Sequence, residues 1–185
     1  GLAFRLAEDN YKCICVDLRG HGENTSAYEN QLLIDIDELI LSIRSGKKVI
    51  AIGHSLGGRV ALLSHADIKI GISPALETAY SDQTTAIIKS MRQHRVKEID
   101  ANINFTYLAA LPLVNDRLTP DDLILYCKKD VPEIVANISN LKNNFSNCVE
   151  IDRALHNDIF LNEDVITTIK KHLKSVMSTD KNGAL

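Results

Sequence analysis

The strongest constraint on the fold is one pentapeptide, Gly53-His54-Ser55-Leu56-Gly57, which stands between an apolar run and a helical pattern. The apolar run, VIAIG at 49–53, predicts a strand, and the pattern of residues 56–65 predicts a helix. A serine in G-x-S-x-G between such elements sits on a tight, strained turn at the carboxyl end of a sheet. The helix that follows brings free N–H groups and a positive dipole end beside the serine oxygen. The motif therefore predicts a nucleophilic serine, Ser55.

Short apolar runs alternate with helical patterns through most of the chain. This alternation predicts an α/β fold with a mostly parallel sheet flanked by helices. Residues 74–120 break the alternation, and we expect them to form a small helical insertion within a single domain that spans residues 1–185. Strands are expected at 13–17, 49–53, 68–73, 123–127 and 148–151, and helices near 28–44, 56–65, 132–144 and 162–176.

Composition excludes several classes of protein. With 45% hydrophobic residues, 24% charged residues and a net charge of −3, the chain does not resemble a disordered protein. It has no basic block, so a nucleic-acid partner is not expected. No apolar run approaches the length of a transmembrane helix, and the first residues do not form a signal peptide. We therefore expect a cytoplasmic protein.

The four cysteines, Cys13, Cys15, Cys127 and Cys148, lie in apolar runs and form no C-x-x-C pair. No histidines cluster near them in the sequence, so neither a zinc site nor any other metal site is expected. We expect small buried thiols in a reducing compartment and no cofactor.

Two motifs resemble those of the α/β-hydrolase superfamily: DLRGHG at 17–22 and GHSLGG at 53–58. The second matches the nucleophile elbow of that family, and the alternation of elements agrees with the resemblance from Tyr11 to Val176. The resemblance implies an α/β-hydrolase fold in which Ser55 attacks and the Leu56 N–H stabilises the oxyanion. It also implies that the DxRGHG turn shapes the base of the pocket, so Asp17 and His21 are expected to be structural.

A serine hydroxyl needs a base, and the base needs a carboxylate that fixes its tautomer. The family supplies them in the order serine, acid, histidine. Among the six histidines, His156 alone lies in a short loop between the last strand and the last helix, and RALHNDIF at 153–160 resembles the loop that carries the family's histidine. We expect His156 to be the base. The others are His21 in the DxRGHG turn, His54 in the elbow, His65 and His172 on helices, and His94 in the insertion.

Asp130 is the expected acid, because it follows LILYCKK and resembles the family's aspartate at a strand end. A carboxylate there can reach the histidine loop of the neighbouring strand. Asp152, at the end of the last strand, and Asp158, two residues after His156, remain alternatives.

These residues predict a serine hydrolase that cleaves a carboxylic ester or thioester with a small to medium apolar acyl group, through an acyl-enzyme. The insertion 74–120 is expected to cover the site as a lid. Tyr107, Leu108 and Leu111 either line an acyl pocket or hold the lid to the body, and both readings remain open. The expected partner is a small-molecule ester or thioester substrate, and the sequence leaves the oligomeric state open.

Two other functions remain open. GHSLGGR places Arg59 one turn into the elbow helix, and the pattern resembles family members that cleave carbon–carbon bonds. In such an enzyme the triad would act as a base and Arg59 would bind a substrate carboxylate. The other alternative is a non-catalytic binding protein with the hydrolase fold, in which Ser55 would not react with a fluorophosphonate.

The amino end departs from the family. The resemblance implies three earlier strands, one of them between the DxRGHG strand and the elbow strand, followed by a second oxyanion donor. Only twelve residues precede Cys13. A central gap would leave two rows of backbone groups unpaired, so either 13–17 pairs directly with 49–53 or residues ahead of Gly1 are missing. We favour missing residues, about 40–80 of them. The chain as written is then expected to be unstable and nearly inactive.

Overall fold

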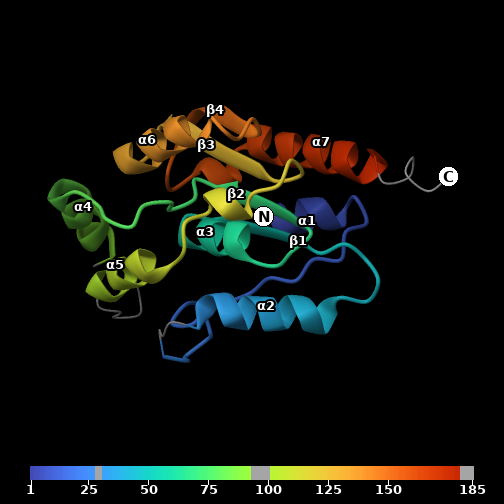
Figure 1. Ribbon diagram of the computed structural model, residues 1–185, viewed down its shortest axis with the longest axis horizontal. Helices are drawn as coiled ribbons and strands as arrows, with labels where there is room; N and C mark the ends of the chain where they lie inside the picture. Colours follow the sequence, from blue (N-terminus) through green and yellow to red (C-terminus); the bar gives the residue numbers. More distant parts are fainter. Residues whose placement is uncertain (28–30, 93–100, 180–185) are drawn as a thin grey trace.

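Four parallel strands form the central sheet of the computed structural model, which describes residues 1–27, 31–92 and 101–179. The strands lie in the order β1-β2-β3-β4, as Figure 1 shows. Ile50 pairs with Ile68, Ile70 with Leu123, and Ile124 with Cys148. This confirms the predicted parallel α/β architecture. The strands are β1 (Ile50–His54), β2 (Ile68–Ile72), β3 (Leu123–Lys129) and β4 (Cys148–Leu155).

Helices follow or connect these strands close to the predicted positions. The helix predicted from residue 28 begins at Leu32, after the N-cap residue Gln31, and residues 28–30 lie outside the described part. The α-helices are α1 (Leu2–Ala7), α2 (Leu32–Ile43), α3 (Leu56–Leu63), α4 (Asp82–Arg92), α5 (Ala101–Ala110), α6 (Pro132–Leu141) and α7 (Glu163–Thr179). Two 3₁₀ turns, η1 (Asn115–Arg117) and η2 (Ile159–Leu161), complete the set that the structure describes.

Helices cover both faces of the sheet, and each face has its own hydrophobic cluster. On one face, α1 and α7 pack against alternate residues of β2 and β3, including Ile70 and Leu125. On the other face, α3 and α6 pack against Ile124 and Tyr126, with residues of α2 and α5 at the margin. Figure 1 shows α2 and α7 on opposite sides of the strands. Burial on both faces explains the apolar run 123–127 of β3, whereas β4, at an edge of the described sheet, carries exposed charged residues.

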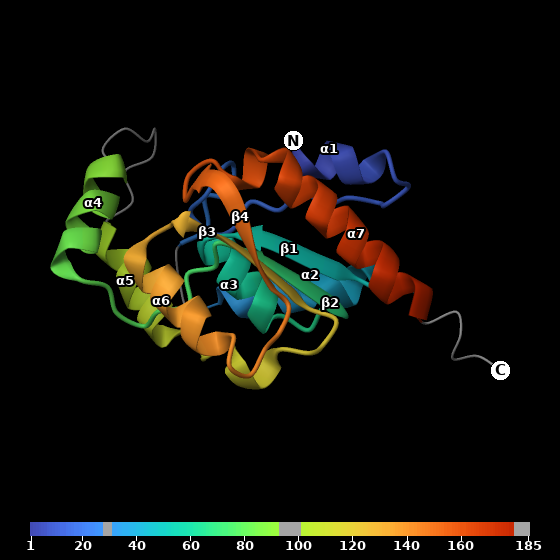
Figure 2. The same cartoon turned by 90° about the horizontal axis from the view of Figure 1, so that it is seen from above.

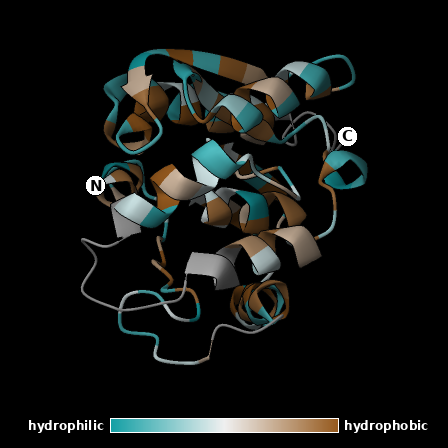
Figure 3. Cartoon of the chain, turned by 90° about the vertical axis from the view of Figure 1, so that its left-hand side faces the viewer, coloured by the Kyte–Doolittle hydropathy of each residue, from teal (hydrophilic) through white to brown (hydrophobic). Residues whose placement is uncertain are grey.

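Helix α2 illustrates how the sequence period fixes these contacts. Leu32 and Ile40, two turns apart, are buried, whereas Ile34 and Leu41 on the other side are exposed. Seen end-on near the bottom of Figure 3, the helix accordingly carries both hydrophobic and hydrophilic positions.

The prediction of a strand at residues 13–17 is wrong. These residues have no strand pairing and Cys13–Val16 are exposed, so the predicted burial of Cys13 and Cys15 is wrong as well. Strand β1 is the edge of the described sheet, and residues 13–17 do not pair with it. The physical reason is that an apolar run becomes a strand only where a neighbouring strand accepts its backbone hydrogen bonds.

The chain between β2 and β3 contains α4, α5 and η1. Helices α4 and α5 contact each other and lie at one end of the molecule, away from α1 and α7 (Figures 1 and 2). His94 falls in the stretch 93–100, outside the described residues.

Among the helices that the structure describes, none combines the length and the apolar character that crossing a membrane requires.

Candidate active site

Ser55 occupies a strained turn between β1 and α3. Its φ of 54° and ψ of −118° lie in a region that non-glycine residues rarely adopt. Gly53 permits the turn, because a Cβ there would lie 2.1 Å from the Gly57 carbonyl oxygen. The Ser55 N–H donates to the Ile72 carbonyl at 3.0 Å, which ties the turn to the end of β2. The sequence motif thus forms the sharp elbow that was expected.

A hydrogen-bonded chain of three side chains converges at this turn. The His156 Nε2 lies 3.1 Å from the Ser55 Oγ, and the His156 Nδ1 lies 2.7 Å from the Asp130 Oδ1. The Asp130 carboxylate is fully buried, while the His156 side chain is partly accessible. If Nδ1 carries the proton, Nε2 is free to accept the serine proton. The three predicted residues, separated by up to 101 positions in sequence, therefore meet at one edge of the sheet.

Buried donors surround the Asp130 carboxylate. Its Oδ1 also accepts the Val131 N–H at 2.8 Å, and its Oδ2 accepts the Ser73 hydroxyl and, more weakly, the Cys127 thiol. Burial acts to raise the pKa of Asp130, but hydrogen bonds from His156 and Ser73 outweigh it and lower that pKa. Burial raises the pKa of Cys127 to about 12, with the nearby Asp130 charge adding to the effect. Asp130 is thus held as an anion beside His156, and Cys127 as a neutral thiol.

Sequence reasoning missed Ser73. It is fully buried, has a φ of 43° and lies directly after β2, where its N–H donates to the Leu125 carbonyl at 2.7 Å. Its only sequence signal is its place after a strand, beside Pro74.

His54, the residue before the serine, contacts the histidine loop. Its Nε2–H donates to the His156 backbone carbonyl at 2.7 Å, and its ring lies 5.0 Å from the rings of both His156 and Phe160. Burial, followed by the proximity of His156, lowers the pKa of His54 to about 4. The ring is therefore neutral at pH 7 and connects the elbow to the loop that carries His156.

Leu56 is the first residue of α3, so its N–H has no acceptor within the helix. It directly follows Ser55, and the positive end of the helix dipole adds to the field there. This N–H is the group expected to stabilise an oxyanion.

The two alternative acids lie elsewhere. Asp158 accepts the Leu155 N–H at 2.7 Å and so shapes the turn before His156, whereas Asp152 is exposed. Among the other described histidines, His65 pairs with Asp37 on the surface and His172 with the Asp121 carbonyl.

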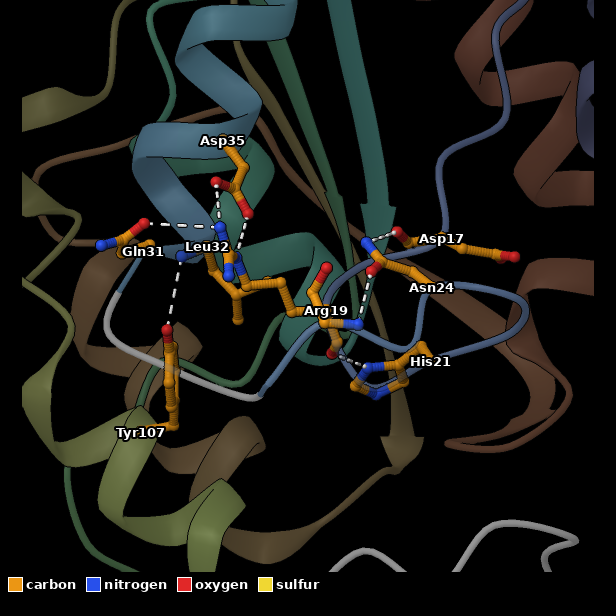
Figure 4. A network of polar contacts seen from close by, with 9 residues as sticks. Asp17, Arg19, His21, Asn24, Gln31, Leu32, Asp35 and Tyr107 are labelled. Atoms are coloured by element: carbon orange, nitrogen blue, oxygen red, sulfur yellow. Dashed lines mark hydrogen bonds and ion pairs between the residues drawn. The ribbon is translucent and has the colours of Figure 1, made fainter.

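The DLRGHG turn makes contacts of a structural kind (Figure 4). Asp17 accepts the Glu23 N–H at 2.8 Å, and the Arg19 guanidinium binds the Asp35 carboxylate of α2. The His21 Nδ1 lies 2.9 Å from the Arg19 carbonyl. A Cβ on Gly22 would lie 2.1 Å from Asp17 Oδ2, so this turn requires glycine. These contacts agree with structural roles for Asp17 and His21.

Arg59 does not have the surroundings expected of a substrate ligand. It is fully buried, and its two Nη atoms donate to four backbone carbonyl oxygens, those of Ala75, Glu77, Leu111 and Pro112. With both Nη atoms occupied by the protein, the arrangement does not support the expectation that Arg59 binds a substrate carboxylate.

The three predicted acyl-binding residues of α5 and the following loop are also buried. Leu108 and Leu111 belong to the cluster that contains α3 and α6, and the Tyr107 hydroxyl accepts the Leu32 N–H at 3.3 Å (Figure 4). These contacts favour the reading in which the three residues attach the insertion to the body of the protein.

Within the described residues, no three His, Cys, Asp or Glu side chains gather in a way that could hold a metal ion.

Comparison with known proteins agrees with the geometry. A model described as the alpha/beta hydrolase family matches residues 1–139, and a search of curated proteins found no match. A solved esterase from Exiguobacterium antarcticum is 21% identical, with a TM-score of 0.66 over 94% of this chain and 85% of the esterase. A thermophilic esterase from Thermogutta terrifontis is 16% identical, with a TM-score of 0.66 over 95% and 85% of the two chains. Tomato methylketone synthase I is 11% identical, with a TM-score of 0.61 over 94% and 91%. At these identities the structural likeness concerns the fold.

Proposed function

The chain belongs to the alpha/beta hydrolase family, and from this premise we propose that it is a serine hydrolase of carboxylic esters or thioesters. The observation that carries the proposal is the continuous chain of contacts from Asp130 through His156 to Ser55, at 2.7 and 3.1 Å. A strained serine, an imidazole within reach of its proton and a buried carboxylate behind the imidazole are what acyl transfer requires.

In the proposed mechanism, the Ser55 Oγ attacks the acyl carbon while its proton moves to the His156 Nε2. The Asp130 anion stabilises the imidazolium that forms, and the Leu56 N–H donates to the oxyanion. The tetrahedral intermediate then collapses, the C–O or C–S bond breaks, and His156 returns the proton to the leaving alcohol or thiol. Water attacks the acyl-enzyme by the same route in reverse, which releases the acid and restores Ser55.

We propose a small to medium apolar acyl group as the preferred substrate, with the helical insertion 74–120 covering the site as a lid. The support for the lid is the position of the insertion directly after β2, whose carboxyl end adjoins Ser55. The preference for an apolar acyl group comes from the resemblance, because Tyr107, Leu108 and Leu111 pack against the body of the protein.

Labelling with a fluorophosphonate probe tests the proposal, because only an activated serine reacts. We expect one labelled site in the wild-type chain, located at Ser55 by mass spectrometry, and acetate release from p-nitrophenyl acetate. Ser55→Ala should abolish labelling and lower turnover by a factor on the order of 10⁴ or more. Ser139→Ala, which removes an exposed serine hydroxyl from α6, is the matched control and should behave as wild type.

Two outcomes would contradict the proposal. A folded wild-type chain that does not label would favour a non-catalytic binding protein. A Ser55→Ala variant with turnover within tenfold of wild type would mean that another group does the chemistry.

A further inference from the structure

Arg59 joins three segments that are far apart in sequence. It lies one turn after the nucleophile in α3, where its N–H donates to the Ser55 carbonyl at 3.1 Å. Its Nη1 donates to the carbonyls of Ala75 at 3.3 Å and Glu77 at 2.6 Å. Its Nη2 donates to those of Leu111 at 2.8 Å and Pro112 at 3.1 Å. One fully buried guanidinium thus contacts two loops as well as its own helix.

The two loops are the ends of the helical insertion. Residues 75–77 lead from β2 toward α4, and residues 111–112 follow directly after α5. We call these two segments the stems. The first stem is also attached to the nucleophile itself, because the Ala75 N–H donates to the Ser55 carbonyl at 3.0 Å. Both stems are therefore fixed to the turn and helix that carry Ser55.

Further contacts hold the first stem to α6. The Glu77 carboxylate accepts the Asn137 amide at 2.7 Å and a hydrogen bond from Tyr80, whose ring packs against Phe105 of α5. Burial raises the pKa of Glu77 and lowers the pKa of Arg59, and the nearby Tyr80 and Glu77 act against that lowering. Glu133 of α6 accepts the Ser81 N–H at 2.9 Å, just before α4 begins. The Arg59 guanidinium reaches both stems at once.

From these contacts we infer that Arg59 is a positioning residue that ties both stems of the insertion to the nucleophile helix and thereby sets which acyl groups the site accepts. The inference rests on the proposed function, since it concerns the same site. A guanidinium presents its donors in a planar fork that can serve four carbonyl oxygens, whereas an ammonium is a single point of charge. Lysine at this position would keep the charge but could not donate hydrogen bonds to the carbonyl oxygens of both stems at once.

The test compares Arg59→Lys and Arg59→Met with wild type on p-nitrophenyl esters of acetate, butyrate and hexanoate. When Arg59 no longer holds the stem at Leu111, kcat/KM for esters of longer acyl groups should rise relative to kcat/KM for the acetate ester. We expect the hexanoate-to-acetate ratio of kcat/KM to rise about fivefold, with most of the change in KM. A residue with only a structural role would lower all three rates in proportion to the folded fraction.

Limited proteolysis provides a readout that does not depend on activity. Thermolysin should cut the insertion, whose Ile87 side chain is exposed, about tenfold faster in the Arg59 variants. Arg44→Lys is the matched control, because Arg44 also donates to a backbone carbonyl, that of His65, but touches neither stem. It should match wild type in both measurements.

The outcomes separate the two proposals. If wild type fails to label with a fluorophosphonate, the hydrolase proposal fails, and proteolysis still tests the tie between Arg59 and the stems. If folded, labelled Arg59 variants show wild-type selectivity and wild-type cleavage, the inference is overturned. If neither variant folds, hydrogen exchange of wild type decides. Slow solvent exchange of the Arg59 Nη protons, which bond carbonyls of both stems, supports the inference, and fast exchange of these protons overturns it.

Discussion

At the scale of single residues, His54 makes stability depend on pH. Its pKa is lowered to about 4 in the folded protein, mainly by burial, whereas an unfolded histidine titrates near 6.5. Between these values the unfolded chain binds a proton that the folded protein does not. Stability contributed by the neutral ring is therefore fully present above about pH 6.5 and is lost as pH falls toward 4, a total on the order of 3 kcal/mol.

We predict that His54→Gln removes this dependence while keeping an amide donor near the His156 carbonyl. Urea unfolding at pH 7.5, 6 and 4.5 measures how the free energy of unfolding depends on pH. Between pH 7.5 and 4.5 the free energy of unfolding should fall by about 2 kcal/mol more in wild type than in His54→Gln, because the other groups titrate equally in both proteins. Equal losses in the two proteins would show that His54 takes up its proton in the folded state as readily as in the unfolded chain.

Ser73 should matter for catalysis although it touches no reacting atom. Its hydroxyl donates to the Asp130 Oδ2 and contributes to the lowered pKa of that carboxyl. Ser73→Ala should raise the pKa of Asp130 toward its ordinary value and leave the carboxylate less firmly oriented toward His156. We expect kcat for p-nitrophenyl acetate to fall about tenfold with KM nearly unchanged.

Ser64→Ala is the control for this prediction, because it removes another buried serine hydroxyl, which donates to the Ala61 carbonyl far from Asp130. It should leave kcat at the wild-type level. A Ser73→Ala variant with kcat within twofold of wild type would mean that Val131 and His156 suffice to orient the carboxylate.

That Ser55, Asp130 and His156 lie together could be predicted from sequence, because each stands next to a recognisable apolar run and parallel strands end at a common edge. The hydrogen-bond contacts that surround these three residues could not be predicted from the sequence. His54 and Arg59 act on backbone carbonyls, which every residue has, so no side-chain type marks the acceptor in the sequence. Arg59 is linked to a substrate carboxylate only in the alternative of a carbon–carbon-cleaving enzyme, by the resemblance of GHSLGGR, whereas its acceptors in the structure belong to the protein's own loops.

At the scale of secondary-structure elements, a buried ion pair joins β2 to the start of β3. The Lys69 ammonium lies 3.1 Å from the Asp122 Oδ2, and the Asp122 Oδ1 accepts the Lys69 N–H at 2.7 Å. Both side chains are almost inaccessible to solvent. The pair fixes the amino ends of these strands, opposite to the end that carries Ser55.

We predict that Lys69→Met destabilises the protein by about 3 kcal/mol, because it leaves the Asp122 carboxylate buried without its counter-charge. Lys170→Met, which breaks the more exposed contact with Asp9, should cost less than about 1 kcal/mol. Urea unfolding of both variants measures the difference. Equal costs would mean that water or another cation reaches Asp122 when Lys69 is replaced.

The four observed strands were predictable because each contains a short apolar run, which is fully buried in β2 and in most of β3, whereas β1 is partly buried and β4 buries only Ile151 and Ala154. The run at 13–17 has the same composition and yet forms no strand in the structure. The hydrophobic pattern of a segment indicates how well its side chains suit a sheet. Whether the segment pairs also depends on a neighbouring strand, which lies elsewhere in the sequence. The exposed Cys13 and Cys15 follow from the same cause.

At the scale of the whole molecule, the sheet separates two hydrophobic clusters that share strands but no helices. Ile169 of α7 belongs to one cluster and Ile138 of α6 to the other, and both are fully buried. The residues that hold the site come from both sides: His156 precedes η2 and α7, while Asp130 precedes α6. The geometry of the triad therefore requires both layers to be docked on the sheet at the same time.

We predict that the two layers unfold together. Ile169→Val and Ile138→Val each remove one buried methylene-sized group, which should cost about 1 kcal/mol. Because the two side chains lie on opposite faces and share no contact within either cluster, the double variant should cost the sum to within about 0.5 kcal/mol. Esterase activity and far-UV circular dichroism should then be lost at the same urea concentration in all four proteins, since one cooperative transition undocks both layers. Loss of activity ahead of the circular dichroism signal in Ile138→Val alone would contradict this, and would show that the α3–α6 layer, with its attached insertion, opens while α7 stays in place.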